Sequence, residues 1–151
     1  MIPELALLFT CDLDRVIAEI KAYPDEDSLW HVAGQINNSA GNLALHLVGN
    51  LSQFVGDDLG DVPFARDREA EFIRKNVPRA ELLGGLERTR ELVAQTLANL
   101  DNARLDRVHP RQPPGFPPDM TSRYFLIHLY GHLNYHLGQI NYHRRLTVLE
   151  H

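Results

Sequence analysis

The chain has 151 residues, of which 44% are hydrophobic, and its formal charge of −5 comes from interspersed acidic and basic residues. This length and composition suit a single domain with an apolar core. The lack of a basic patch argues against nucleic acid as the main partner. Charged residues break the longest apolar stretches, such as residues 2–20, which argues against a membrane span. No secretory signal is visible, and the single Cys11 rules out an intramolecular disulfide, so we expect a cytoplasmic protein.

Helical periodicity dominates the chain. We expect four long helices, at residues 3–22, 39–54, 78–100 and about 122–146. Asn37, Asn38 and Ser39 offer N-caps for the second helix, and Thr121 or Ser122 for the fourth. No strand-like alternation of useful length is present. These elements predict an all-α protein, a four-helix bundle with a long crossover connection.

The segments between the helices carry turn and charge signals. Residues 56–63 are expected to form a loop, and residues 64–75 an irregular segment or a short helix. The charged run at 66–69 (RDRE) is expected to be a solvated face or a set of salt bridges. Residues 107–119 contain five prolines and are expected to form the crossover. We expect one domain over residues 1–148, with residues 149–151 resembling the start of a histidine tag.

Histidines concentrate in the last predicted helix, at positions 128, 132, 136 and 143. A helix turns about 100° per residue, so His128, His132 and His136 fall within an arc of roughly 80°. Gln139 and His143 lie in the same arc. Two imidazoles one turn apart can hold a metal ion between them, and neutral imidazole is a common ligand of zinc, nickel, copper and iron.

A helical pair of histidines leaves a metal ion under-coordinated, because a catalytic site commonly has three protein ligands and one open position. His46 is the natural third ligand, since it lies in the apolar run LALHLV of the second helix and is expected to be buried. Spacing does not decide between the pairs His128/His132 and His132/His136. The histidines left over, including His143, are candidates for hydrogen bonding to the ligands, proton transfer or packing.

Three amides near the histidines, those of Asn42, Asn50 and Gln139, are candidates for orienting the imidazoles or binding a substrate or cofactor. Such amides also commonly satisfy backbone groups. No Asp or Glu lies in the histidine stripe, so His128 and Tyr135 are the candidates for moving protons. Neither Glu-x-x-His nor His-Glu-x-x-His occurs, which weighs against a di-iron carboxylate bundle and a zincin-type protease.

Two segments resemble the DinB/YfiT-like superfamily. They are NSAGNLALHLVGN at residues 38–50 and HLNYHLGQI at residues 132–140, and the resemblance extends over almost the whole chain. It implies a four-helix bundle, often dimeric, and a divalent metal, most often zinc or nickel, held by three histidines. Carried onto this chain, the implied ligands are His46, His132 and His136. Some relatives are transferases or isomerases that use low-molecular-weight thiols.

The leading hypothesis is therefore a metal-dependent enzyme, a thiol-dependent transferase that acts on small electrophiles. A metal-dependent hydrolase is an alternative, because a metal ion can activate either a thiol or water. A second alternative is a non-catalytic metal-binding or stress-related helical module that forms dimers. Kinship of fold does not fix the reaction.

Overall fold

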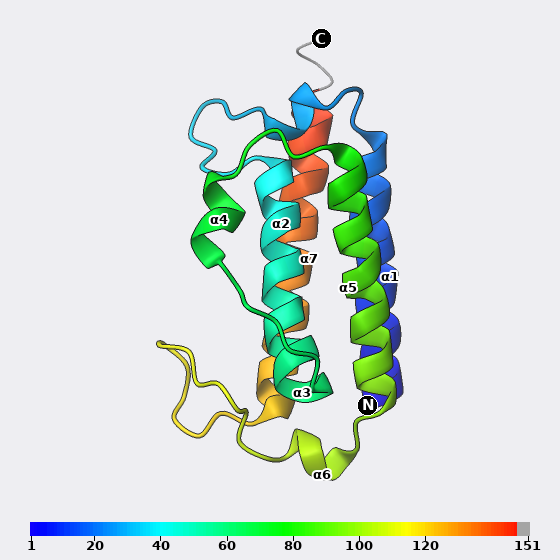
Figure 1. The fold of residues 1–151 in the computed structure, drawn as a ribbon, viewed down its shortest axis with the longest axis vertical. Helices are drawn as coiled ribbons and strands as arrows, with labels where there is room; N and C mark the ends of the chain where they lie inside the picture. The colour runs from blue at the N-terminus through cyan, green and yellow to red at the C-terminus, as the bar shows by residue number, and fades with distance from the viewer. Residues whose placement is uncertain (148–151) are drawn as a thin grey trace.

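Four long helices form the body of the protein in a computed structural model that describes residues 1–147. They are α1 (Ile2–Ala22), α2 (Ala40–Leu51), α5 (Arg79–Ala98) and α7 (Ser122–Thr147). Helices α1 and α7 run in one direction, and α2 and α5 run in the other (Figure 1). Each of α1 and α2 packs against both α5 and α7. The predicted all-α four-helix bundle is confirmed, and the described part of the chain contains no strand.

Short helices join the long ones. They are a 3₁₀ turn (Asp27–Trp30), a π-helix (Ser52–Asp57), α3 (Asp58–Gly60), α4 (Arg68–Ile73) and α6 (Asn102–Leu105). The expected tag remnant at residues 149–151 lies outside the described residues, as does the last residue of the expected domain. No helix among residues 1–147 combines the length and the apolar character that crossing a membrane requires.

The core forms where the apolar stripes of the long helices meet. Those stripes arise because residues three and four apart lie on one helix face. In α1, Phe9, Leu13, Val16 and Ile20 are each 0% exposed. An ion pair also joins α1 to α7: Arg144 donates from Nε to Glu19 Oε2 at 2.5 Å. Together these contacts hold α7, with its histidines, along the bundle.

The second helix continues further than its sequence predicts. We expected a loop from residue 56, but helical structure runs without a break from Ala40 through the π-helix to Gly60. Gly56 and Gly60 are not helix breakers here; they let this segment lie close to α5. A Cβ at Gly56 would stand 2.4 Å from a side-chain atom of Leu92, and one at Gly60 would stand 2.4 Å from Thr96 Oγ1.

The crossover lies in a different segment from the one we predicted. The connection that returns along the bundle comprises residues 61–78 and includes α4, which lies beside α2 (Figure 1). The proline-rich residues 107–119 instead link α6 to α7 at one end of the bundle. The prolines were correctly read as preventing a helix, but prolines do not determine how far a connection travels.

A buried histidine fastens the proline-rich segment to the bundle. His109, 1% exposed, donates from Nε2 to Asp58 Oδ2 at 3.1 Å, because a carboxylate can only accept. Its Nδ1 is 3.1 Å from Ser122 Oγ, and Arg111 donates to Asp58 Oδ1 at 2.7 Å. Although serine, histidine and aspartate stand in line, Ser122 is 1% exposed and out of reach of a substrate. The arrangement is therefore structural.

Candidate metal centre

Helix α2 delivers His46 to the bundle interior. The helix begins after Ser39, whose Oγ accepts a hydrogen bond from the Asn42 backbone amide at 3.2 Å, the usual role of an N-cap serine. The apolar residues that follow face the core, and His46 lies among them with 6% of its surface exposed. The expectation that this histidine is buried is confirmed.

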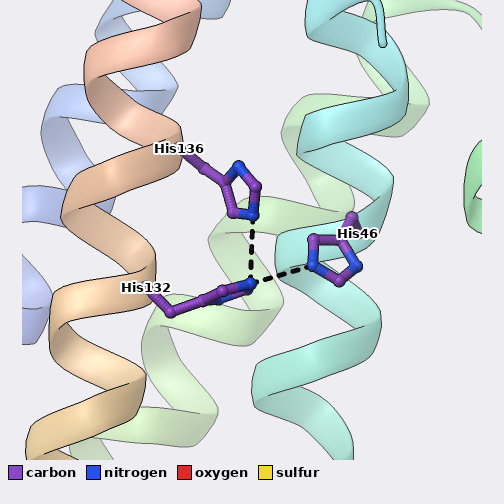
Figure 2. A group of neighbouring side chains, drawn as sticks. All are labelled: His46, His132 and His136. Atoms are coloured by element: carbon purple, nitrogen blue, oxygen red, sulfur yellow. Dashed lines mark hydrogen bonds between the residues drawn. The ribbon is translucent and has the colours of Figure 1, made fainter. Parts of the chain in front are cut away.

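Helix α7 presents two histidines to His46. In Figure 2 the rings of His132 and His136 project from α7 toward the ring of His46 on α2. The Nε2 atom of His132 lies 3.0 Å from His46 Nε2 and 3.0 Å from His136 Nε2. One ligand atom from each of the three histidines lies within 4.8 Å of the others. Spacing left two histidine pairs open, and the structure brings His132 and His136, the pair implied by the family resemblance, to His46.

Hydrogen bonds at the far side of two rings fix how these imidazoles are protonated. Glu71 Oε1 is 2.9 Å from His46 Nδ1, and Gln139 Oε1 is 2.7 Å from His136 Nδ1. Both oxygens are acceptors, so each Nδ1 must donate its hydrogen. A neutral imidazole then has a lone pair at Nε2, and the Nε2 lone pairs of His46 and His136 are left to converge on the same point.

The trio fits a divalent cation. Zinc–nitrogen bonds of about 2.0–2.1 Å at tetrahedral angles would separate two ligand nitrogens by roughly 3.3 Å, close to the 3.0 Å separations found. Without a cation, His132 Nε2–H can donate to the Nε2 lone pairs of His46 and His136. His132 Nδ1 is buried and has no hydrogen-bond partner among residues 1–147, so no protein acceptor or donor opposes a shift of that hydrogen to Nδ1 when a cation binds at Nε2. The three histidines can therefore hold a metal ion and leave a coordination position for another ligand.

Burial keeps His132 and His136 in the neutral form that metal binding requires. Desolvation, reinforced by the neighbouring imidazoles of His136 and His46, lowers the pKa of His132 to about 3. Desolvation also lowers the pKa of His136, against the hydrogen bond that His136 donates to Gln139, which raises it. Since an imidazolium cannot coordinate a metal, these lowered pKa values leave the nitrogens available at neutral pH.

A buried ion pair supports His46 from behind. Glu71, 6% exposed, accepts hydrogen bonds from Arg66 Nε and Nη2, both at 2.8 Å, as well as from His46. Burial alone raises the pKa of Glu71, but the hydrogen bonds from Arg66 and His46 outweigh it and hold that pKa below the ordinary value. A carboxylate behind a ligand histidine fixes the ring orientation and makes the other nitrogen a stronger ligand.

The sequence did not reveal this support. We expected the charged run at 66–69 to be a solvated face or a set of salt bridges; Arg66 follows the second alternative, since its side chain is 7% exposed and pairs with Glu71. Glu71 was not among the candidates. Gly49, one turn after His46, makes room for it: a Cβ there would stand 1.8 Å from Glu71 Oε2. The glycine in LHLVGN was the only available signal, and it indicates a close neighbour without identifying it.

The three candidate amides have different positions. Asn42 donates to the backbone carbonyls of Glu71 and Arg74, at 2.9 and 2.8 Å, and so holds α4 in place rather than facing a ligand. Gln139 orients His136, as described above. Asn50 lines a cavity beside His46 and leaves its Oδ1 without a hydrogen-bond partner among the described residues.

Two cavities flank the histidine trio. One, of about 550 Å³, is bordered by His46, His132, Arg66, Arg68 and Phe116, and we call it the arginine-lined cavity. The other, of about 530 Å³, is bordered by His136, Gln139, Tyr135 and Tyr142, and we call it the tyrosine-lined cavity. Both lie within the range of small-molecule sites. Ligands can thus approach the histidines from either side.

Both candidates for proton transfer border these cavities. His128 lines the arginine-lined cavity, with its ring stacked 6.3 Å from that of His132 between centroids. Desolvation lowers the pKa of His128. Tyr135 lines the tyrosine-lined cavity, 66% exposed, with its ring 5.4 Å from that of His136. His143 is turned away from the trio: its Nδ1 is 2.7 Å from Tyr23 Oη.

Comparison with known proteins agrees with the fold. A search of curated proteins gives no match. The family model of the DinB superfamily matches residues 11–140, a span that includes His46, His132 and His136. On this match and the helical bundle, the chain belongs to the DinB superfamily.

Proposed function

We propose that this protein is a metal-dependent enzyme whose divalent cation, zinc or nickel, is held by His46, His132 and His136. The observation that carries the proposal is the approach of His46 Nε2 and His136 Nε2 to His132 Nε2, at 3.0 Å each, with hydrogen bonds to Glu71 and Gln139 leaving a lone pair on the first two atoms. A cation at this point would accept a lone pair from each of the three rings.

Three neutral imidazoles leave the charge of a bound cation uncompensated. The cation would therefore lower the pKa of a thiol or a water molecule at the open position. The protein provides the surroundings for that chemistry. Glu71 holds the ring of His46, and Gln139 holds that of His136. His128 and Tyr135 border the two cavities and would exchange protons with a bound substrate.

The favoured reaction is transfer of a low-molecular-weight thiol to a small electrophile. Two cavities flanking one centre support it, since a two-substrate reaction needs separate places for thiol and electrophile. Hydrolysis is the alternative, with water in place of the thiol. A non-catalytic metal-binding or stress-related module is the other alternative, and it predicts bound metal without turnover.

We further propose a homodimer that acts in the cytoplasm. Along α7 several large apolar side chains are exposed in the single chain: Tyr124, Ile127, Tyr135, Tyr142 and Leu146. A face of this kind supports association, because contiguous exposed apolar surface is uncommon on monomers. Light scattering of the purified protein at micromolar concentration checks the mass, and a strictly monomeric mass would refute the dimer.

Metal analysis of tag-free protein tests the site itself. Wild type purified without chelator should carry close to one zinc or nickel per chain, and His132→Ala should carry less than about a tenth of that. The matched control is His128→Ala, which removes a histidine from the same helix but outside the trio and should retain metal. An empty wild type, or equal loss in both variants, would contradict the three-histidine assignment.

Calorimetry separates an enzyme-like site from a purely structural one. A low-molecular-weight thiol, for example cysteine or glutathione, should bind the zinc-loaded protein and release a proton, and should not bind the chelated protein. Equal binding of the thiol to the zinc-loaded and the chelated protein would count against thiol activation by the metal. Heat release identical in buffers of different ionisation enthalpy would do the same, because no proton would then leave the thiol.

A further inference from the structure

The arginine-lined cavity carries positive charge and no carboxylate. Arg66 and Arg68 both border it, and none of the described residues that line it is Asp or Glu. The tyrosine-lined cavity has neither acidic nor basic residues other than histidines among its described lining residues. The two sides of the metal centre therefore differ in charge, which means that they suit ligands of different charge.

The two arginines are not equivalent. Arg66 is committed to Glu71 through two hydrogen bonds of 2.8 Å, so its charge is balanced within the protein. The Arg68 guanidinium lies over the ring of Phe72, 5.2 Å from its centroid, and forms no ion pair within residues 1–147. Stacking on an aromatic face holds a guanidinium in place while its N–H groups remain available to an anion.

The rest of the cavity wall is mainly apolar, with one unused amide. Phe116 and Phe125 meet edge to face with 5.2 Å between centroids, and Phe54 packs on Phe125 at 4.9 Å. Asn50, only 7% exposed, leaves its Oδ1 without a partner in the described part of the chain. A buried amide without a protein partner is free to turn toward a ligand, because leaving it unsatisfied carries a penalty.

We propose that the arginine-lined cavity binds a small carboxylate, with the carboxylate on Arg68, a polar group at Asn50 and an aromatic or aliphatic body against Phe116 and Phe125. This deepens the proposed function by naming the charge class of one substrate, and it rests on that function only in making the ligand a substrate. The cavity itself binds the anion whether or not a metal occupies the neighbouring histidines.

The test uses chelated, metal-free protein, so that a carboxylate cannot bind through the metal. Phenylacetate and its neutral analogue phenylacetamide are titrated in turn, and binding is followed by ligand-observed NMR and calorimetry. Wild type should prefer phenylacetate by about tenfold, the worth of one charge-assisted pair at a partly exposed site. The preference should shrink as ionic strength rises. Arg68→Gln should remove the preference and leave phenylacetamide binding unchanged.

Arg74→Gln is the matched control, since Arg74 follows the same short helix, pairs with Glu81 and does not border this cavity. It should retain the full preference. Equal binding of both probes, no binding of phenylacetate at millimolar concentration, or the same loss in both arginine variants would overturn the inference. Zinc titration of the same samples reports separately on the histidine trio, so the anion site can fail while metal binding persists, and the reverse.

Discussion

The support behind His46 gives the sharpest prediction about the centre. Glu71 accepts three hydrogen bonds, from Arg66 Nε, Arg66 Nη2 and His46 Nδ1, at 2.8, 2.8 and 2.9 Å. Glu71→Gln preserves the shape but replaces one acceptor oxygen with an amide that can only donate. Whichever way the amide turns, at least one donor among these three loses its partner, and Arg66 loses its counter-charge in a buried position.

Two magnitudes follow from Glu71→Gln. Loss of the group that orients a ligand histidine lowers metal affinity by about 10- to 100-fold, or roughly 1.4–2.8 kcal/mol. Breaking a buried ion pair costs about 3–5 kcal/mol. Because glutamine keeps one acceptor oxygen, we expect the free energy of unfolding to fall by about 3 kcal/mol. That loss is within the stability of an ordinary domain, so the variant should still fold.

Zinc titration by calorimetry at pH 7 measures the first effect, and urea unfolding of chelated protein measures the second. Glu87→Gln is the control, since Glu87 is an exposed glutamate on α5. It should match wild type in both assays. The reasoning would be refuted if Glu71→Gln bound zinc as tightly as wild type, because Glu71 would then not determine the orientation or basicity of His46.

Three further variants test the packing around the site and across the bundle. Gly49→Ala should weaken zinc binding at least tenfold, because the new Cβ would displace Glu71. Glu19→Gln should lessen the loss of stability in acid. Burial raises the pKa of Glu19, but hydrogen bonds from Arg144 and Asn141 outweigh it and lower that pKa, so the contribution of Glu19 to stability is present above the ordinary value of 4.5 and is lost as pH falls through the lowered pKa. His109→Gln should lower the free energy of unfolding by about 1–3 kcal/mol through buried partners left unsatisfied.

Matched variants control these measurements. Gly84→Ala places a methyl group on a helix where only the flexible end of Arg88 is near, and it should leave zinc affinity unchanged. Unfolding midpoints from pH 3 to 7 check Glu19→Gln, and an acid transition as steep as that of wild type would refute the role of its pair. Urea unfolding checks His109→Gln against His128→Gln, and equal stability of the two would show that the buried network contributes nothing.

The sequence predicted the long helices well because each buries one continuous stripe. It predicted the end of the second helix poorly, since Gly56 and Gly60 look like breakers in isolation. Only the packing against Leu92 and Thr96 shows why small residues are needed there. Local sequence also could not say which connection travels along the bundle, because that depends on the directions of helices far apart in the chain.

The three-histidine cluster was predictable where it depends on local sequence, and its support was unpredictable where it depends on segments far apart in the chain. His132 and His136 are one helical turn apart, and His46 stands out as a polar residue in an apolar run. Glu71 lies in a segment without periodicity, and its approach to His46 depends on the return of α4 along α2. A charged residue in such a segment usually faces solvent, so nothing in its neighbours distinguishes it.

X-ray absorption spectroscopy of the zinc-loaded protein tests the central claim most directly, because it reports the atoms bound to the metal. The account predicts one zinc per chain with three imidazole nitrogens at about 2.0–2.1 Å and one further light atom. His46→Ala should lose one imidazole from that shell. A shell dominated by oxygen or sulfur, or one unchanged by His46→Ala, would contradict the assignment of the three histidines.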